Sequence, residues 1–219
     1  MTTFLKNKHR PHDPVWHVQV AMVVAIGLQL LLPDKFAVGT RYVLPAVEAL
    51  LLWALSFTTP RERIFKSLAR RVNVLLLIGI TSAANAYALG RVANLLLQTH
   101  ISNGRELILT SINIFLTNII IFALWYWEMD GGGPGERHKL ERYELDFAFP
   151  QQQNNELHHP GWRPTFVDYL YTSSTNAMTF GPADTVPLTR RAKMLMVLQS
   201  TISLITVALV AARAVGILN

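Results

Sequence analysis

The residues best suited to chemistry lie between Leu170 and Lys193, where the sequence reads L-Y-T-S-S-T-N-A-M-T-F-G-P-A-D-T-V-P-L-T-R-R-A-K. A run of hydroxyl and amide side chains predicts a short polar helix, and Gly181 and Pro182 predict the turn that ends it. A helix C-terminus carries a partial negative charge and carbonyl groups without partners in the helix. Such carbonyls favour a cation. Asp184 follows the turn and has three open roles: a filter-supporting acid, a cation ligand, or a cap of the helix that starts near Thr189.

Two charged residues interrupt apolar stretches that are otherwise long enough to enter a membrane. Glu48 lies within one stretch and Arg91 roughly six residues before the end of the next, and we expect both to lie near the same face at a depth of about 9 Å. A lone charge at that depth is unfavourable, and pairing relieves it. We therefore predict that Glu48 and Arg91 form an ion pair or share a polar pocket. In the alternative, Arg91 reaches the headgroups and Glu48 is protonated or hydrated.

A polar stripe follows one face of the last apolar stretch. Gln199, Ser203 and Thr206 recur at helical spacing and are candidates for lining a water path through a pore. The alternative is that they form hydrogen bonds between helices, as polar residues at helix contacts commonly do. We expect this second role for Asn113 and Asn118, which lie in an earlier apolar stretch.

The elements that must position these residues are helices in a membrane. The chain has 219 residues, of which 51% are hydrophobic and 16% charged, and it contains no cysteine. These values exclude a disordered chain and any thiol or disulfide chemistry. A membrane-spanning helix needs about 20 mostly apolar residues. Five stretches meet or approach this length: Val15–Leu32, Val38–Phe57, Val72–Leu97, Leu107–Trp127 and Ala192–Leu218. A weaker one, Phe166–Phe180, suits a re-entrant or interfacial helix.

The charges predict an orientation. With five spans, fifteen of the twenty Lys and Arg residues lie on the side of the N-terminus. Because Lys and Arg collect in cytoplasmic loops, the N-terminus is predicted inside and the C-terminus outside. The chain then divides into a cytoplasmic tail over 1–14, a four-helix membrane region over 15–128, a cytoplasmic loop over 129–165 and a last segment over 166–219.

The last segment resembles the pore module of tetrameric potassium channels, in which a pore helix, a filter and an inner helix follow one another. Their pattern is T-x-x-T-x-T-V-G-Y-G-D-x-x-P-x-T, and the residues that stand without a gap at T-V-G-Y-G-D are Thr179, Phe180, Gly181, Pro182, Ala183 and Asp184. Pro187 and Thr189 match the proline and threonine that follow. Thr175 would also lie near the narrowest point of such a pore. The resemblance covers about 50 residues and implies an oligomeric, tetrameric pore for a small cation. The same segment, with W-Y-W-E-M-D-G-G-G-P before the loop, also resembles DUF1345-like bacterial membrane proteins of unknown function.

Two departures from the channel pattern bear on selectivity. Ala183 replaces the second filter glycine, whose backbone conformation is unfavourable for a residue with a side chain. Pro182 replaces the tyrosine, fixes φ and removes an N–H group. We therefore expect no strong potassium selectivity. The charge count also places the end of the last helix outside, whereas in potassium channels the inner helix ends inside. Either the topology is inverted, the span count differs by one, or the likeness is only architectural.

The sequence as a whole predicts an all-α integral membrane protein with five spans and a short pore-helix-like segment. The first hypothesis for its function is an oligomeric cation pore in a bacterial inner membrane. The alternatives are a non-conducting partner-binding or assembly protein, and a small transporter gated at Pro182. No catalytic triad, zinc-hydrolase spacing or phosphate loop is present, so we expect no enzyme, no cofactor, no bound metal and no nucleic-acid partner.

Overall fold

The computed structural model describes residues 16–57, 68–96, 104–134, 136–137, 144–153, 162–182 and 184–218. The predicted tail over 1–14 and the filter-like Ala183 lie outside these residues, as does much of the predicted loop over 129–165.

The described chain is mainly helical, as predicted. The α-helices are α1 (Trp16–Leu30), α2 (Val43–Phe57), α3 (Leu68–Leu96), α4 (Gly104–Met129), α5 (Pro150–Gln153), α6 (Phe166–Thr179) and α7 (Arg190–Leu218). Two 3-10 turns, η1 (Asp34–Phe36) and η3 (Asp130–Gly132), follow α1 and α4. Two short strands, β1 (Phe147–Ala148) and β2 (Val186–Pro187), pair antiparallel, with Phe147 opposite Pro187.

Three of the described helices are long and apolar enough to cross a membrane. Their spanning segments are Arg70–Leu96, Gly104–Gly132 and Arg190–Val215, which belong to α3, α4 and α7. The helices α1 and α2 are apolar but shorter, with 15 residues each. The chain is therefore built like a membrane protein, and the five-span arrangement remains a prediction.

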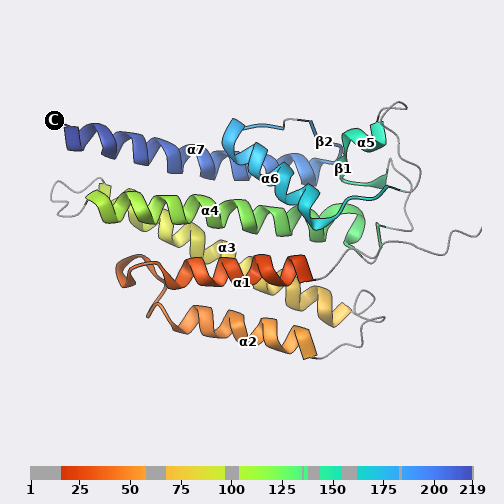
Figure 1. Cartoon of the computed structure of the whole chain (residues 1–219), viewed down its shortest axis with the longest axis horizontal. Coiled ribbons are helices and arrows are strands. Elements are labelled where there is room, and N and C mark those ends of the chain that lie inside the picture. Colours follow the sequence, from red (N-terminus) through yellow and green to blue (C-terminus); the bar gives the residue numbers. More distant parts are fainter. Residues whose placement is uncertain are drawn as a thin grey trace, which may run out of the picture.

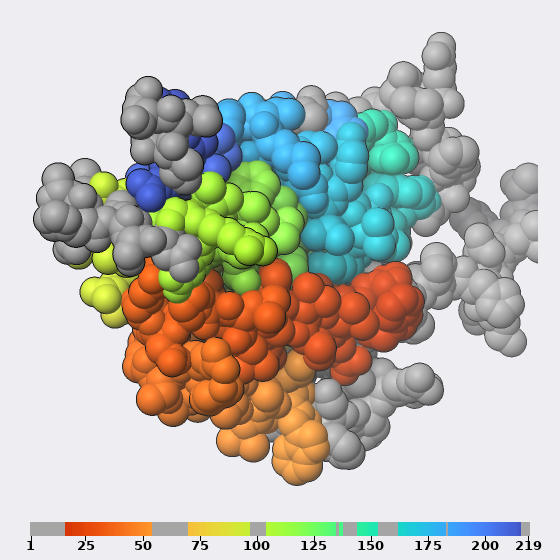
Figure 2. Space-filling view, turned by 60° about the vertical axis from the view of Figure 1, so that its left-hand side comes forward, coloured from red at the N-terminus to blue at the C-terminus, as the bar shows by residue number. Residues whose placement is uncertain are grey.

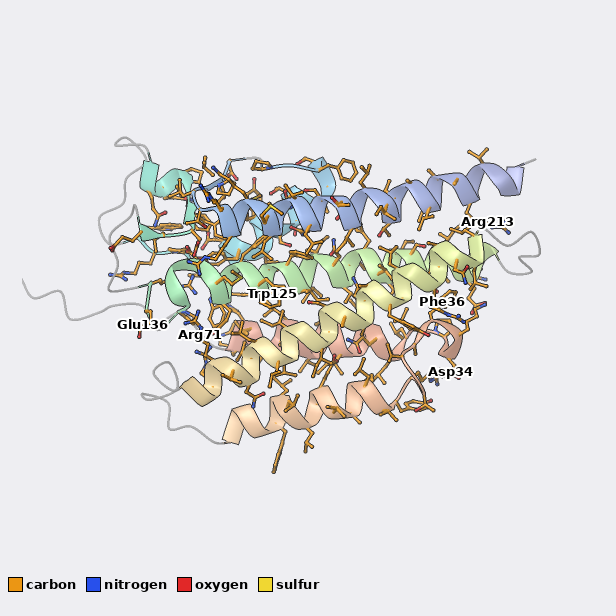
Figure 3. The ribbon with its side chains drawn as sticks, turned by 180° about the vertical axis from the view of Figure 1, so that it is seen from behind. Asp34, Phe36, Arg71, Trp125, Glu136 and Arg213 are labelled. Carbon is orange, nitrogen blue, oxygen red and sulfur yellow. The ribbon has the colours of Figure 1, made fainter. Side chains whose placement is uncertain are left out.

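The five longer helices lie side by side and alternate in direction along the chain (Figure 1). The beginnings of α1, α3 and α7 lie at one end of the bundle, together with the end of α4 and the short strands. Figure 3 shows Arg71 and Glu136 at this end, and Asp34, Phe36 and Arg213 at the other. We call the first end the strand end because it carries β1 and β2.

The helix α6 has a different course from the other helices. It begins at the strand end and stops partway along α7, and the chain then returns to β2 at the same end (Figure 1). A short helix is found where one was predicted over Phe166–Phe180, because α6 spans Phe166–Thr179. Its re-entrant or interfacial position in a membrane stays a prediction. We call α6 together with the returning segment up to β2 the α6 hairpin.

The helix α4 forms the centre of the bundle and packs against α1, α3, α6 and α7. Its side chains are buried on nearly every side in the half towards the strand end, where Tyr126 and Trp127 join the main apolar core. Such an all-round burial requires a helix that is apolar on every face. Figure 2 shows the surface of the chain with α6 seated against α4, opposite the orange residues of α1 and α2.

Asparagine side chains join these helices, as predicted. Asn113 Nδ2 donates to the carbonyl of Leu28 at 2.8 Å and links α4 to α1. Asn118 Nδ2 donates to Ser203 Oγ at 2.9 Å and links α4 to α7. Because an unpaired amide is unfavourable in an apolar interior, these bonds help fix the helices relative to one another.

Candidate functional site

The α6 hairpin starts at a well-defined helix N-terminus. The Asp168 carboxylate accepts hydrogen bonds from the Thr165 backbone N–H at 2.7 Å and from the Thr165 hydroxyl at 2.9 Å. This carboxylate lies in the first turn, where it also interacts favourably with the helix dipole. The pairing fixes where the polar helix begins.

Hydroxyl groups along α6 bond to the helix itself. Ser174 Oγ donates to the Leu170 carbonyl at 2.7 Å, and Thr179 Oγ1 lies 2.8 Å from the Thr175 carbonyl. Thr175 Oγ1 likewise lies within 3.1 Å of the carbonyls of Tyr171 and Thr172. Such bonds to the preceding turn let hydroxyl side chains enter an apolar environment without unpaired donors.

The tip of the hairpin is exposed and strained. Phe180 ends α6 in the left-handed region with φ of 57°, and it is the one non-glycine residue with positive φ in the described part of the chain. This conformation is unfavourable by about 1–2 kcal/mol for a residue with a side chain. Thr179 Oγ1 also lies 2.9 Å from the Gly181 carbonyl and so bridges the turn. Strained backbone is often retained where it serves function.

Asp184 lies on the segment that returns from the hairpin tip to β2, and its side chain is exposed. Its carboxylate accepts one weak hydrogen bond, from Thr185 Oγ1 at 3.4 Å. The cap of α7 is Thr189, whose hydroxyl accepts from the Ala192 N–H at 3.3 Å. Asp184 is therefore not the helix cap, and the roles in filter support or cation binding remain open.

A groove of about 400 Å³ runs beside the hairpin tip along α7. Phe180, Gly181 and Pro182 form one wall, and Met196, Val197 and Leu204 contribute to the other. Asn176 and Ser200 also line the groove. The groove therefore combines mostly apolar walls with a small polar floor.

Behind the groove, a polar network joins α4, α6 and α7. Gln199 Nε2 donates to Ser173 Oγ at 2.7 Å and to the Ser173 carbonyl at 2.9 Å, while its Oε1 accepts from Asn176 at 2.8 Å and from the Tyr126 hydroxyl. Asn176 also donates to the Met196 carbonyl at 3.1 Å. The network contains no charged group, and both ends of the Gln199 amide have partners.

The predicted pore-lining stripe faces this interior. Gln199, Ser203 and Thr206 are at most 1% exposed. Thr206 Oγ1 donates to the Ile202 carbonyl of its own helix, and Ser203 accepts from Asn118. In the described chain Gln199 and Ser203 bond across helices, which matches the alternative considered for them, whereas Thr206 bonds within α7.

The structure does not form the predicted ion pair between Glu48 and Arg91. Glu48 Oε1 accepts hydrogen bonds from Gln29 at 3.1 Å and from Thr81 at 2.8 Å. Arg91 Nε donates instead to the Lys35 carbonyl at 3.1 Å. Glu48 lies level with Thr81, whereas Arg91 lies ten residues further along α3, about 15 Å away along the helix axis. The two residues therefore do not share the depth predicted from the sequence. The backbone after α1 satisfies Arg91, and Glu48 faces a contact between α1 and α3.

A charged cluster at the strand end is absent from the sequence predictions. The Tyr169 hydroxyl donates to Asp130 Oδ2 and accepts from Arg137, and Arg137 also donates to the Trp127 carbonyl at 2.7 Å. Asp130 Oδ1 accepts from the Asp146 backbone N–H at 2.8 Å. The cluster ties α6 to the end of α4 and to β1, so it positions the base of the hairpin.

Asp146 extends this cluster to the start of α7. Its Oδ2 accepts from the Gly131 N–H at 3.1 Å, and its Oδ1 accepts from the Thr189 hydroxyl. The three glycines over 131–133 all have positive φ, and a Cβ on Gly133 would lie 2.9 Å from the Glu128 carbonyl oxygen. In the sequence, the run of three glycines directly after Asp130 was the available signal for this site. It marks a tight turn that non-glycine residues cannot adopt without strain.

A second buried ion pair lies beside the cluster. Arg70 donates to Glu128 Oε2 at 3.2 Å, and these side chains are 6% and 1% exposed. In the described part of the chain, His, Asp and Glu side chains do not gather in groups of three that would hold a metal ion. The buried pairs Arg70–Glu128 and Arg137–Asp130 thus compensate each other's charge and fix the backbone at this end.

Family models, curated proteins and solved structures were each compared with this chain, and none of the three comparisons found a match.

Proposed function

We propose that the chain is a subunit of an oligomeric membrane pore for a small cation, with the tips of several α6 hairpins around the axis. The observation that carries this proposal is the hairpin itself: it enters and leaves at the strand end and presents an exposed turn partway along α7 (Figure 1). Non-helical backbone at membrane depth is tolerated where it is buried in protein or lines water.

The exposed tip supports an assembly of several chains. Phe180, Pro182 and Asp184 are exposed in the single chain, whereas the polar residues on the inner face of α6 are buried. Exposed apolar side chains continue along α7, including Met194, Val197 and Leu198. In the proposed oligomer, neighbouring copies cover part of this face and the tips face a common water path. A tetramer is the number that the channel resemblance implies.

The chemistry of the tip favours a cation. The α6 C-terminus directs its partial negative charge towards the turn, and Asp184 adds a carboxylate on the returning segment. Pro182 and the substitution of Ala183 for a glycine disfavour a ladder of carbonyls of the potassium-selective kind. We therefore propose permeation by small monovalent cations with little preference for potassium.

The proposed orientation places the strand end in the cytoplasm and uses five spans. Arg70, Arg71 and Arg137 are at this end, as are Arg190 and Lys193 at the start of α7. Cytoplasmic ends collect Lys and Arg. The hairpin then enters from the cytoplasmic side, which is the inverted arrangement relative to potassium channels.

The first experiment is the subunit count of the full chain in mild detergent, measured by native mass spectrometry. We expect a closed oligomer, with four copies as the leading number. A stable monomer that also gives no ion flux in liposomes would contradict the pore.

Ion flux tests the tip directly. In liposomes we expect sodium and potassium flux at similar rates, reduced about fivefold or more by Asp184→Asn, because a carboxylate attracts a cation at 4 Å by ~1 kcal/mol in water. Asp34→Asn removes the same charge from an exposed site at the opposite end and is the matched control. Equal flux in all three proteins would rule out Asp184 as a cation-attracting group.

A second candidate function is a non-conducting assembly protein. The observation that favours it is the largely apolar lining of the groove beside the tip, which suits an apolar segment of a partner as well as a neighbouring copy. An oligomer that forms in detergent but conducts no ion in liposomes would favour this second function.

A further inference from the structure

The Glu48 carboxyl is a buried acid that the proposed pore does not use and that has no charged partner among the described residues. It lies on α2, on the far side of the molecule from the α6 hairpin (Figure 1), and its side chain is fully buried. Oε1 accepts from Gln29 on α1 and contacts Thr81 on α3, whereas Oε2 is buried and has no hydrogen-bond partner. An ionised carboxylate has strong acceptor demand at both oxygens, so a bare Oε2 is unfavourable for that form.

Among the described residues, no charged group bonds to Glu48 to compensate an ionised carboxylate. The helices packed against α2 are α1 and α3. Their titratable side chains in the described residues are His17 on α1 and Arg70, Arg71, Tyr87 and Arg91 on α3. None of these bonds to Glu48, whose partners are Gln29 and Thr81 alone. Arg41, in the loop before α2, donates to the Tyr42 hydroxyl.

The hydrogen count at Thr81 favours a protonated Glu48. Thr81 Oγ1 lies 2.9 Å from the Leu77 carbonyl and 2.8 Å from Glu48 Oε1, both of which are acceptors when Glu48 is ionised. A hydroxyl carries one hydrogen and can satisfy only one of them. Both contacts become hydrogen bonds when Glu48 carries a proton on Oε1 and donates it to Thr81, which in turn donates to Leu77. Oε1 can still accept from Gln29, and Oε2 becomes the carbonyl oxygen of a neutral acid.

We propose that Glu48 is a proton-binding site within the helices, a carboxylic acid whose proton lies on Oε1 and is donated to Thr81. Proton binding converts the carboxylate to the acid, and no other bond forms or breaks. This inference is independent of the proposed pore, because it rests on α1, α2 and α3 and involves no residue of the hairpin.

A small cavity lies next to Gln29, one of the two partners of Glu48. It has a volume of about 20 Å³, and its lining combines apolar side chains such as Leu32 and Phe36 with the polar residues Gln29, Thr40, Arg41, Asn85 and Thr117. This volume suits one water molecule, for which the polar residues supply partners. Glu48 does not line the cavity itself, and Gln29 lies between the two.

Infrared difference spectroscopy of the full chain in lipid bilayers tests the proposal. A protonated carboxylic acid has a carbonyl stretching band separate from those of carboxylates and amides, and the band shifts in D₂O. We expect the wild-type-minus-Glu48→Gln difference at neutral pH to contain this acid band and no carboxylate band. Glu106→Gln removes a partly exposed carboxylate that pairs with Lys35 at 2.6 Å, and its difference should contain only carboxylate bands.

Thr81→Val supplies a second variant that keeps Glu48 in place. Removing the acceptor of the Glu48 O–H group should move the acid band to a higher frequency without loss of intensity. A carboxylate band in the Glu48→Gln difference, or a Thr81→Val spectrum in which carboxylate bands shift and the acid band does not, would overturn the proposal.

Discussion

Two fully buried polar side chains, Glu48 and Gln199, lie on opposite sides of the bundle. They differ in how their polar atoms find hydrogen-bond partners. Gln199 uses both ends of its amide, with two donors aimed at Ser173 and an oxygen that accepts from Asn176 and Tyr126. Glu48 concentrates its partners on one oxygen and leaves the other without any. The first is a neutral group with complete hydrogen bonding, and the second is an ionisable group with incomplete hydrogen bonding.

The difference separates structural from chemical roles. A neutral amide does not titrate, and the amide of Gln199 already has hydrogen-bond partners at both ends. The network around Gln199 therefore has a structural role, which is to fix α6 and α7 on α4. An acid with one bare oxygen changes its hydrogen bonding when it gains or loses a proton. Ionisable groups within membrane segments are therefore functional candidates by default, whereas amides at helix contacts are candidates for packing.

The largest expected effect on stability comes from removing the hydrogen bonds of Gln199. Gln199→Leu removes the four hydrogen bonds of this side chain. At about 0.6 kcal/mol for each bond within a membrane, the free energy of unfolding should fall by about 2 kcal/mol. Thermal unfolding in detergent measures it. Thr201→Val, an exposed site whose hydroxyl bonds only to its own helix, should change stability by less than about 0.5 kcal/mol. Equal effects of the two variants would contradict the structural role of Gln199.

A smaller effect is expected at the base of the hairpin. Tyr169→Phe removes the hydroxyl between Asp130 and Arg137, but the two charges remain 4.0 Å apart and still attract each other. We expect a loss of about 1 kcal/mol in unfolding free energy. Tyr171→Phe, two residues along α6 at an exposed position, is the matched control. A loss as large as that of Gln199→Leu would show that the cluster at the strand end holds the hairpin as firmly as the buried network does.

The smallest effect concerns the pair that the structure does not form. A double-mutant cycle with Glu48→Gln and Arg91→Gln should give a coupling energy below about 0.3–0.5 kcal/mol, as for independent sites. Unfolding free energies of the two single variants, the double variant and the wild type measure it. A coupling above about 1 kcal/mol would restore the ion pair and remove the contrast between Glu48 and Gln199.

The helices were predictable from the sequence because their signals are local. The run of hydroxyl and amide side chains over 172–176 and the Gly181-Pro182 turn predict α6 within one residue of its observed end. The roles of Asn113 and Asn118 also follow from residue type, since an amide at an apolar helix contact needs a partner. The pore, its cargo and its orientation are predictions that the bounds of these helices do not test.

The contacts between distant segments were not predictable in the same way. Counting residues placed Glu48 and Arg91 at one depth, but the level and the direction of Glu48 depend on how α2 packs against α1 and α3. The Tyr169 hydroxyl reaches Asp130 across a separation of 39 residues, and helical spacing carries no information about such a pair. The channel-like pattern drew attention to Asp184, while Asp146 holds the start of α7 through Thr189.

The unequal lengths of the helices have a consequence for the surrounding lipid. The helices α1 and α2 have 15 residues and α7 has 29, which correspond to about 22 Å and about 44 Å. The hydrocarbon core of a bilayer is about 30 Å thick. In the proposed membrane arrangement, the bilayer must become thinner beside α2. On the opposite flank, either the bilayer becomes thicker or α7 tilts. Such hydrophobic mismatch sorts proteins by membrane thickness. We therefore expect this protein to orient its thin flank towards short-chain lipids and to deform a uniform bilayer asymmetrically.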